Sequence, residues 1–497
     1  MSEPTPAGAS SAASAESSAL AATSDPDPRR WWALAVIALA QLMAVLDATI
    51  VTIALPEAGK DLAMTESQLA WVVASYSLAL GALLLLGGRV GDFMGRKRIF
   101  LVGLAGFAAV SGLGALSTDA SMLIAARVGQ GVFAALLTPA ALALLTVTFT
   151  DPGERAKAFA VYGSIAGGGM AVGLILGGLL TQYVSWRWTL GVNVPISLVA
   201  LFLGVKYLTE SRAEGGRRYD IPGVILSAVG LGVLVYGFTI AGEVAGGWTS
   251  PRALSLLMGG FALLAIFVFW ETLTSHPLLP MRVFMDRNRG GSYVALILTA
   301  IGLSALFFFL TFYFQGAMGL SPVATGLAFI PFAVAIVASS TLTASLLPKT
   351  GPRPLVVGGA LIASCGMFML SRLTANTTMI YIVIAELLVG IGVALAVVPM
   401  SSTALIGVDD RDAGVASALV NAVQQIGAAM GITLLTAAAA SATAYHLAEF
   451  PDDLTNAQIA GFTRAFLIGA VILIVVAAVA FGMISAQKPG TPAEESN

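Results

Sequence analysis

Cysteine, histidine and charge are scarce in this sequence. One cysteine, Cys365, and two histidines stand among 497 residues, so neither an internal disulfide framework nor a cysteine-based metal site can be built. Charged residues make up 10% of the chain, against about 25% in soluble proteins. The net charge of −2 and the lack of a basic, aromatic-interleaved stretch argue against nucleic-acid binding. We expect no metal, no organic cofactor and no nucleic-acid partner, and we expect Cys365 to be a small core residue.

Long apolar stretches fill most of the chain instead. Hydrophobic residues make up 57% of the sequence and the mean hydropathy is +0.89, which indicates an all-α polytopic membrane protein. A hydropathy window of about 19 residues predicts fourteen spans. They are expected near residues 31–55, 69–88, 99–117, 121–147, 158–181, 188–209, 221–241, 252–272, 291–314, 323–347, 354–371, 378–401, 413–438 and 463–485.

Residues 1–28 precede the first span. They are rich in Ala, Ser, Thr and Pro and lack an apolar core, so we expect a disordered cytoplasmic tail. The apolar run after Arg29 and Arg30 is too long for a signal peptide, contains Asp47 and has no convincing small-residue cleavage site. We therefore expect it to remain as an uncleaved first span.

The basic residues predict the orientation. If the N-terminus is cytoplasmic, most of the 25 Lys and Arg residues fall on the inner side, and Arg127 is left inside a span. Those that fall on the outer side are Lys60, Arg187, Arg252, Arg372 and Arg464. This asymmetry follows the positive-inside rule, so we expect a multi-pass protein of the cytoplasmic (inner) membrane with both termini cytoplasmic.

Three charged side chains fall inside predicted spans, where charge is costly and normally marks an ion or substrate path. At 1.5 Å per residue, Asp47 lies about 24 Å from the inner end of its span and Arg127 about 9 Å from the outer end of its own, which are comparable depths. The two form either a structural ion pair or a proton site, because protonation of a buried acid beside a cation depends on access of water or ligand. Glu386 is either a third cavity acid or an interfacial residue.

A short basic loop follows the second span. GGRVGDFMGRKRIF (87–100) contains Gly88, suited to close helix packing, and Asp92, which can meet a helix N-terminus or an arginine. The pattern resembles the signature loop of the major facilitator superfamily, although Phe93 stands where that family often has a basic residue. The matching residues are Gly88, Asp92, Gly95, Arg96 and Lys97.

Further stretches resemble the 14-span drug:proton antiporter branch of that superfamily. LDATIVTIALP (46–56) is similar to its first-span motif, with Thr52 in place of a frequent asparagine. ARVGQGVFAALLTP (126–139) is similar to its fourth-span motif, whose arginine, here Arg127, is held in that family to take part in proton transfer. SWRWTLGVNVPI (185–196) and AGVASALVNAVQQIGAAMG (413–431) also look like this branch.

The fifth span resembles the antiporter motif of the same branch. GSIAGGGMAVGLILGG (163–178) has a glycine-lined face that allows close helix packing, with Leu174 in place of the usual proline. The glycines expected to serve this packing are Gly163, Gly167, Gly173, Gly177 and Gly178.

The resemblance implies a major facilitator fold of two six-helix bundles, related by pseudo-symmetry, with two additional central helices. LPKTGPRP (347–354) lies where a second copy of the signature loop would fall and keeps a glycine and two basic residues. The expected divisions are a tail at 1–28, a first bundle at 29–209, a central pair at 210–290, a second bundle at 291–485 and a cytoplasmic tail at 486–497.

Substrates of such folds bind near the bilayer midplane, and transport is a rocking of one half against the other. Aromatic, methionine and amide side chains suit unlike apolar cations, although each is more often ordinary packing. The candidates for substrate contact are Gln41, Met43, Tyr313, Gln315 and Asn421.

The resemblance implies a proton-coupled antiporter that exports drugs or antibiotics. Its expected proton-coupling residues are Asp47, Arg127 and Glu386, its partners are small molecules, protons and membrane lipids, and we expect it to act as a monomer. The alternative is a dedicated exporter of one endogenous metabolite or lipid, while uptake by symport fits the fifth-span motif less well. A membrane enzyme is disfavoured because two loop histidines and no close acid pair within the spans are expected. A sensor is disfavoured because the longest polar stretch is the first 28 residues.

Overall fold

The computed structural model describes residues 29–212, 220–243, 247–275, 277–408 and 413–485, apart from the side chains at 166, 167 and 413. Every regular element within these residues is helical. Fourteen of the helical segments are long and apolar enough to cross a membrane. The predicted all-α fold with fourteen spans is therefore confirmed.

The helices of the first six spans are α2 (Arg30–Asp61), α3 (Glu66–Met94), α4 (Arg96–Ala115), α5 (Ala120–Thr148), α6 (Pro152–Tyr183) and α8 (Asn193–Tyr207), the last preceded by the short α7 (Trp188–Gly191). Spans seven and eight are α9 (Ile221–Glu243) and α10 (Pro251–Leu273), with the turn η1 (Gly247–Thr249) between them. After α11 (Met281–Phe284) follow α12 (Arg287–Phe312) with η2 (Tyr313–Ala317), α13 (Pro322–Ala328) with α14 (Ile330–Thr350), α15 (Pro352–Leu370), α16 (Met379–Thr403), α17 (Ala413–Glu449) and α18 (Leu454–Met483).

Short polar side chains begin many of these helices. Thr65 forms a capping box with Gln68 at the start of α3, and the Asp119 carboxylate accepts a backbone N–H at the start of α5. Ser250 and Ser321 cap α10 and α13, and each is followed by proline at the first helical position. These residues are the usual signals for a helix N-terminus, and they fix where the spans begin.

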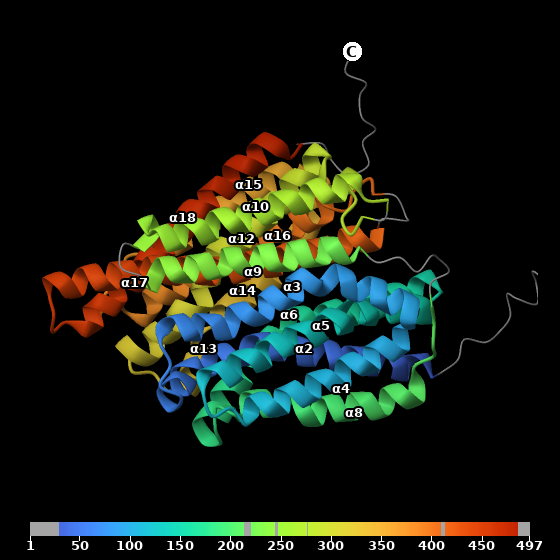
Figure 1. Ribbon diagram of the computed structural model, residues 1–497, viewed down its shortest axis with the longest axis horizontal. Coiled ribbons are helices and arrows are strands. Elements are labelled where there is room, and N and C mark those ends of the chain that lie inside the picture. Colours follow the sequence, from blue (N-terminus) through green and yellow to red (C-terminus); the bar gives the residue numbers. More distant parts are fainter. Residues whose placement is uncertain (1–28, 213–219, 244–246, 276, 409–412, 486–497) are drawn as a thin grey trace, which may run out of the picture.

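Several helices are longer than their apolar stretches predict, and α17 exceeds its stretch by the most. The expected span ended near residue 438, but α17 continues to Glu449. The hydropathy window ends where polar residues begin, whereas the added segment is rich in alanine, which favours helix in water as well. Figure 1 shows the α17–α18 turn projecting beyond the other helices at the left.

The helices pack in two sets with a pair beside them. In the first set α5 packs against α3 and α4, α2 against α6, and α4 against α8. In the second set α12 packs against α17 and α18, and α15 against α16 and α18. Contacts of α3 with α17 and of α6 with α13 join the two sets. The α9–α10 pair lies along this junction, with α9 against α3 and α17 and α10 outside it (Figure 1).

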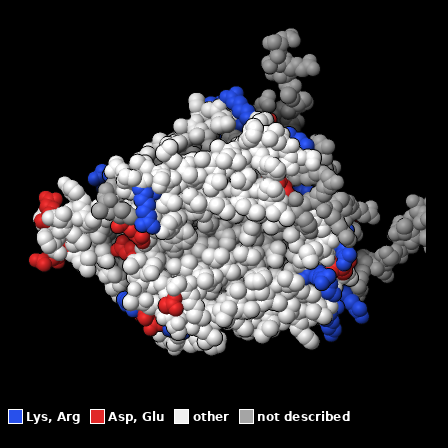
Figure 2. Space-filling view, viewed as in Figure 1, with Lys and Arg blue, Asp and Glu red and all other residues white. Residues whose placement is uncertain are grey.

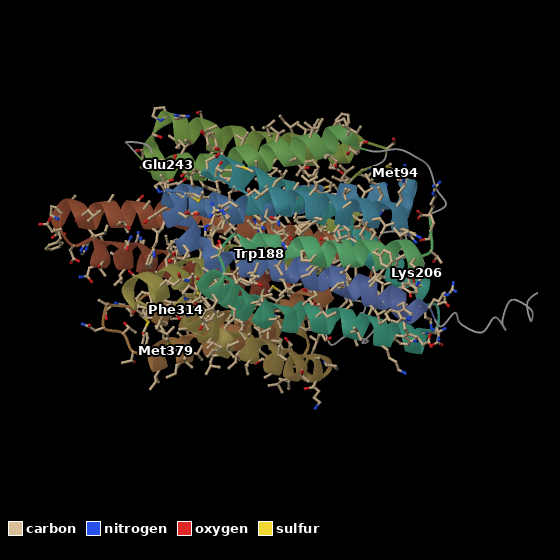
Figure 3. The ribbon with its side chains drawn as sticks, turned by 90° about the horizontal axis from the view of Figure 1, so that it is seen from below. Met94, Trp188, Lys206, Glu243, Phe314 and Met379 are labelled. Atoms are coloured by element: carbon tan, nitrogen blue, oxygen red, sulfur yellow. The ribbon has the colours of Figure 1, made fainter. Side chains whose placement is uncertain are left out.

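The two ends of the bundle differ in charge. Met94 and Lys206 lie at one end, and Glu243, Phe314 and Met379 lie toward the other (Figure 3). Lys and Arg predominate at the first of these ends, at the right of Figure 2, whereas most of the visible Asp and Glu lie at the left, beside a few Lys and Arg. We call the end with Met94 and Lys206 the basic end.

Cys365 lies on α15 and is exposed. The expectation that it is a small core residue is wrong. A hydrophobic run does not distinguish the side of a helix that faces the protein core from the side that faces lipid, because both are apolar.

Candidate functional site

A buried polar cluster joins four helices of the first set. The Asp47 carboxylate on α2 accepts three hydrogen bonds, from Arg127 Nη1 at 2.6 Å, Gln130 Nε2 at 2.8 Å and Asn193 Nδ2 at 2.6 Å. Gln130 Nε2 also donates to Ser111 Oγ on α4 at 2.8 Å. Asp47, Gln130, Asn193 and Ser111 are all 0% exposed. The carboxylate is therefore held entirely by protein donors.

The Arg127 side chain contacts residues on α2, α3 and its own helix, α5. Its Nε donates to the Val72 carbonyl on α3 at 3.0 Å, and its Nη1 donates to Gln130 Oε1 at 2.7 Å as well as to Asp47. Its Cζ lies 4.4 Å from the centroid of the Tyr76 ring, a cation–π arrangement. The guanidinium group has several donors in a fixed plane, so these contacts set its position relative to α2.

The sequence positions Arg127 by bringing α5 close to α3. Gly131 lies one helical turn after Arg127, and a Cβ there would lie 2.4 Å from the Tyr76 carbonyl oxygen. A Cβ on Gly87 would lie 1.9 Å from the Ala135 carbonyl oxygen. Only glycine permits both backbone contacts, and the close approach brings the Arg127 side chain within reach of Val72.

Charge in an apolar span identified Asp47 and Arg127, and the structure brings these two into direct contact. Sequence reasoning missed Gln130, Asn193 and Ser111, because neutral polar residues barely change the hydropathy of a span. A usable signal for Gln130 was its spacing of three residues from Arg127, which places both on one helix face.

Glu386 takes no part in this cluster. It is 0% exposed on α16, which packs against α14 and α15 in the second set. Neither carboxylate oxygen has a hydrogen-bond partner among the residues that the structure describes. Glu386 is thus a buried acid apart from the Asp47 cluster.

The signature loop ties α3 and α4 to the chain that follows α8. Gly95, with φ of +109°, ends α3, and Arg96 donates to Asp92 Oδ1 at 2.8 Å. Lys97 Nζ donates to the Leu208 carbonyl at 2.6 Å, and the Glu210 carboxylate accepts the Lys97 N–H at 3.1 Å. The positive φ favours glycine at this turn. The loop therefore anchors the basic ends of α4 and α8 together.

Close packing at this helix occurs at a different glycine from the one expected. A Cβ on Gly88 would lie 3.6 Å from Pro139 Cβ, which is ordinary contact, whereas Gly87 meets the α5 backbone.

The sequence profile described as "Major Facilitator Superfamily" matches residues 37–432, which include this cluster and this loop. The chain belongs to the major facilitator superfamily. Fold comparison agrees: a bacterial homolog of the human lysosomal transporter Spinster, in an inward-facing and unoccupied conformation, superposes with a TM-score of 0.66 at 16% identity, covering 92% of this chain and 98% of the other.

Relatives within the superfamily carry names that refer to antibiotics. The puromycin resistance protein pur8 of Streptomyces alboniger is 46% identical over 475 residues, covering 94% of each chain. The cephamycin export protein CmcT of Amycolatopsis lactamdurans is 36% identical, covering 86% of this chain and 88% of the relative. The match to pur8 includes almost all of the spans.

The glycines of this superfamily member's fifth span differ in their surroundings. A Cβ on Gly173 or Gly177 would meet α2, at 2.0 Å from Thr49 Oγ1 and 2.8 Å from the Ile50 carbonyl oxygen. A Cβ on Gly178 would lie 2.6 Å from the Pro322 carbonyl oxygen on α13.

Gly163 does not serve close packing as expected, since nothing lies within 4 Å of a Cβ there. α6 still meets α2 at this level, through Tyr162 and Gln41, but Gly163 is exposed on another side of the helix. Gly167 falls outside the residues whose surroundings the structure describes.

The five candidate substrate contacts are not brought together. Met43 is 0% exposed and accepts from Ser197 Oγ, and the buried Tyr313 donates to the Thr374 carbonyl. Gln41 accepts from the Tyr162 hydroxyl, and Asn421 donates to the Ser417 carbonyl of its own helix. Each of these four groups thus has a partner inside the protein.

Gln315, the fifth candidate, lines a cavity of about 310 Å³ between the two sets, toward the end opposite the basic end. It donates to the Ile53 carbonyl at 3.0 Å. Phe308, Phe312 and Phe462 supply much of the apolar wall. The volume falls at the lower end of the range of small-molecule sites, about 300–1,000 Å³.

Proposed function

We propose that this protein is a proton-coupled exporter of antibiotics or related small drugs, and that Asp47 with Arg127 is its proton-coupling site. The observation that carries the proposal is a buried carboxylate whose three hydrogen bonds all come from donors on other helices. The relatives named for puromycin resistance and cephamycin export support the substrate class.

The hydrogen bonds connect protonation of Asp47 to helix packing. Arg127 can only donate hydrogen bonds. A protonated oxygen of Asp47 is itself a donor, so the bond from Arg127 is lost if the proton is on Oδ2, and the bond from Asn193 is lost if it is on Oδ1. Losing the Arg127 bond leaves Gln130 as the link from Asp47 to α5, and losing the Asn193 bond removes the link from Asp47 to α8. Proton binding therefore changes how three helices of the first set are held, which is what coupling to a rocking motion requires.

Asn193 supplies an acceptor for that proton. Its Oδ1 is buried and has no hydrogen-bond partner in the described part of the chain. Rotation of the amide would turn this oxygen toward Asp47, so that a protonated carboxyl group can donate to it. We assign Glu386 as a further proton-coupling candidate in the second set, because it is buried without a partner.

The conformation fits an inward-facing state if the basic end is cytoplasmic, as the positive-inside rule favours. Away from the basic end, Gly178 and Gly326 hold α6 against α13 at backbone contact distance. Toward the basic end, Phe159 on α6 is 39% exposed and Leu342 on α14 is 53% exposed. We propose a multi-pass protein of the cytoplasmic membrane with both termini inside, and the division into bundles at 29–209 and 291–485 around a central pair at 210–290.

The mechanism needs protons, a small molecule and surrounding lipid, and we propose that one chain suffices. No reaction chemistry is required, so we propose a transporter without enzymatic activity. The cavity lined by Gln315 is our candidate for the exit side of the drug path, because it lies between the two sets.

A second candidate is export of one compound only. Relatives such as CmcT and the tetracenomycin C resistance and export protein of Streptomyces glaucescens are each named for a single antibiotic. The two candidates differ only in the range of substrates.

Transport by reconstituted vesicles with an imposed pH gradient tests the proposal, with puromycin as the first probe and a panel of cationic dyes and neutral antibiotics beside it. We expect proton-driven transport by the wild type and its loss in Asp47→Asn. Asp119→Asn is the matched control, since Asp119 is an exposed carboxylate and asparagine retains its helix cap. Full activity of Asp47→Asn would refute the role of this residue, and transport of puromycin alone would favour the single-substrate candidate.

A further inference from the structure

Two buried carboxyl groups meet where α9 begins and α10 ends. Asp220 is 8% exposed and Glu271, in the last turn of α10, is 3% exposed. A Cβ on Gly223 would lie 2.4 Å from Asp220 Oδ2 and 2.6 Å from Glu271 Oε1, so the two oxygens face the same small space. Asp220 lies one residue before α9, so the pair is at the ends of the spans rather than within them. Sequence reasoning missed it because the two residues are far apart in the chain.

Each carboxyl group has one oxygen with donors and one without. Asp220 Oδ1 accepts from Trp270 Nε1 at 2.7 Å and from the Gly223 N–H at 3.0 Å, and Glu271 Oε2 accepts from the Leu279 N–H at 2.8 Å. The facing oxygens, Asp220 Oδ2 and Glu271 Oε1, have no hydrogen-bond partner among the described residues. A buried acceptor left without a donor is costly, so this space lacks one donor that would serve both oxygens.

We propose that Asp220 and Glu271 form a proton-binding site, in which one proton lies between Asp220 Oδ2 and Glu271 Oε1. A proton on either oxygen donates to the other, so a single proton satisfies both. It also leaves the pair with one negative charge instead of two, and like charges at such close range oppose joint ionisation. The site is separate from Asp47 and does not depend on the proposed export function.

A proton fits this site better than a metal ion does. Hard cations such as Ca²⁺ take about six to eight oxygen ligands, and this space offers two free oxygens. The described residues include no group of three or more His, Cys, Asp or Glu side chains able to hold a metal.

Among the residues that the structure describes, few charged groups lie near the pair. α9 packs against α3, α10 and α17, and α17 carries no Lys, Arg, Asp or Glu before its last residue, Glu449. Toward the basic end, the charged groups of the neighbouring elements are Arg89 and Asp92 on α3 and Arg282 on α11. Arg89 Nη2 donates to the Pro277 carbonyl at 3.1 Å and Asp92 pairs with Arg96, so these described contacts leave the pair to be neutralised by a proton.

The proton has a structural consequence for residues 277–280. Glu271 holds the Leu279 N–H, and Arg89 of α3 holds the Pro277 carbonyl. This segment therefore links α10 to α3. When the proton leaves for the water at the basic end, two negative charges remain, the carboxylates separate, and Glu271 no longer holds the segment in place. The Leu279 N–H bond alone favours an ionised Glu271, but burial and the neighbouring Asp220 charge oppose ionisation more strongly. The segment is therefore held at low pH and loosens as pH rises.

Hydrogen–deuterium exchange of the full-length protein in lipid nanodiscs tests this site without a transport assay. The backbone amides of Leu278 and Leu279 should lose protection by about fivefold or more, in the usual range of coupled sites, as pH rises from acidic to alkaline values. In Glu271→Gln the amide places an N–H donor where the shared proton lay, so protection should no longer depend on pH. The control is Glu243→Gln, an exposed acid at the other end of the α9–α10 pair, and exchange rates are compared with this control at each pH to remove the intrinsic pH effect.

Asp220→Asn provides a second variant, since its amide offers the same donor from the opposite side. It should also remove the pH dependence, and the infrared band of a protonated carboxyl group should weaken in both pair variants but not in Glu243→Gln. An unchanged pH response and an unchanged band in both pair variants would overturn the proposal. Protection that follows sodium concentration at fixed pH would also overturn it, in favour of a cation site.

Discussion

At the scale of single residues, the negative charge of Asp47 is stabilised by hydrogen bonds from side chains on two other helices. The carboxylate bonds to α5 through Arg127 and Gln130 and to α8 through Asn193. Removing one partner of a buried ion pair leaves an uncompensated charge, which typically costs about 3–5 kcal/mol. The two charged members are therefore expected to affect stability as well as transport, and variants must separate the two effects.

Arg127 allows such a separation. Arg127→Lys keeps a positive charge near Asp47 but cannot reproduce the bonds to Val72, Gln130 and Asp47 together. Arg127→Ala removes the charge. We expect Arg127→Ala to lose proton-driven drug transport and to lower the melting temperature, and Arg127→Lys to retain partial transport with a smaller loss of stability. Equal transport by both variants in vesicles would indicate that the ion pair is only structural.

Asn193 and Ser111 form a matched pair of neutral cluster members. Asn193 contacts the carboxylate itself, whereas Ser111 contacts only Gln130. We expect Asn193→Ala to reduce proton-driven transport at least tenfold, because loss of one hydrogen bond to a charged group is worth about 1.5–3 kcal/mol. Ser111→Ala should have a smaller effect. The measurement is the initial rate of uptake at a fixed pH gradient, and a larger loss in Ser111→Ala would contradict the role given to Asn193.

The sequence alone predicted the two charged residues of this cluster but not its neutral polar residues. Asp47 and Arg127 are identified by their cost in lipid, and the rise of a helix predicts their similar depth. Gln130 and Asn193 have no such cost in a hydropathy window. Their role depends on which helices are neighbours, and that arrangement is not visible in a single sequence.

At the scale of helices, glycine determines which backbones touch. The fifth-span motif predicted close packing of α6, and the structure shows that its glycines differ: Gly173 and Gly177 face α2, Gly178 faces α13 and Gly163 faces open space. The periodicity of the motif locates the glycines on the helix. It does not say which glycine meets which neighbour, because that depends on the crossing of the helices.

This difference gives a controlled experiment. Gly178→Ala and Gly163→Ala both gain about 1 kcal/mol of helix propensity, but only the Cβ at position 178 would lie 2.6 Å from a backbone oxygen. Overpacking of this kind costs about 1–3 kcal/mol. We expect Gly178→Ala to shift the protein toward states in which α6 and α13 separate, and Gly163→Ala to leave the balance unchanged.

The separation can be followed at Thr325, which is 0% exposed on α13. In a Cys365→Ser background, Thr325→Cys should react with a thiol reagent about tenfold faster when Gly178→Ala is present. An equal rate in the Gly178→Ala and Gly163→Ala proteins would show that the contact does not hold this side closed.

At the scale of the whole molecule, the charge asymmetry predicts its orientation in the membrane. Thr118 is exposed between α4 and α5, away from the basic end, and Thr209 is exposed beyond α8 at the basic end. With Cys365→Ser as background, a membrane-impermeant maleimide should label Thr118→Cys on intact cells and Thr209→Cys only after permeabilisation. The reverse pattern would place the basic end outside.

The energetics of the proposed exchange are adequate for resistance. A membrane potential of about 150 mV provides about 3.4 kcal/mol for each net charge moved, at about 2.3 kcal/mol per 100 mV. Since each 1.4 kcal/mol is a factor of ten, one proton supports about a 300-fold gradient of a neutral drug.

Gly177 and Gly178 are consecutive residues that touch different halves of the protein, one at the Ile50 carbonyl of α2 and the other at the Pro322 carbonyl of α13. Ile50 lies one helical turn from Asp47. Side chains between helices can change rotamer and absorb a small displacement, but backbone in contact with backbone has no such compliance. If Asp47 is the proton site, we expect a sub-ångström shift of α2 to be passed through α6 to α13. This pair of glycines would then act as a stiff mechanical joint between the proposed proton site and the far half.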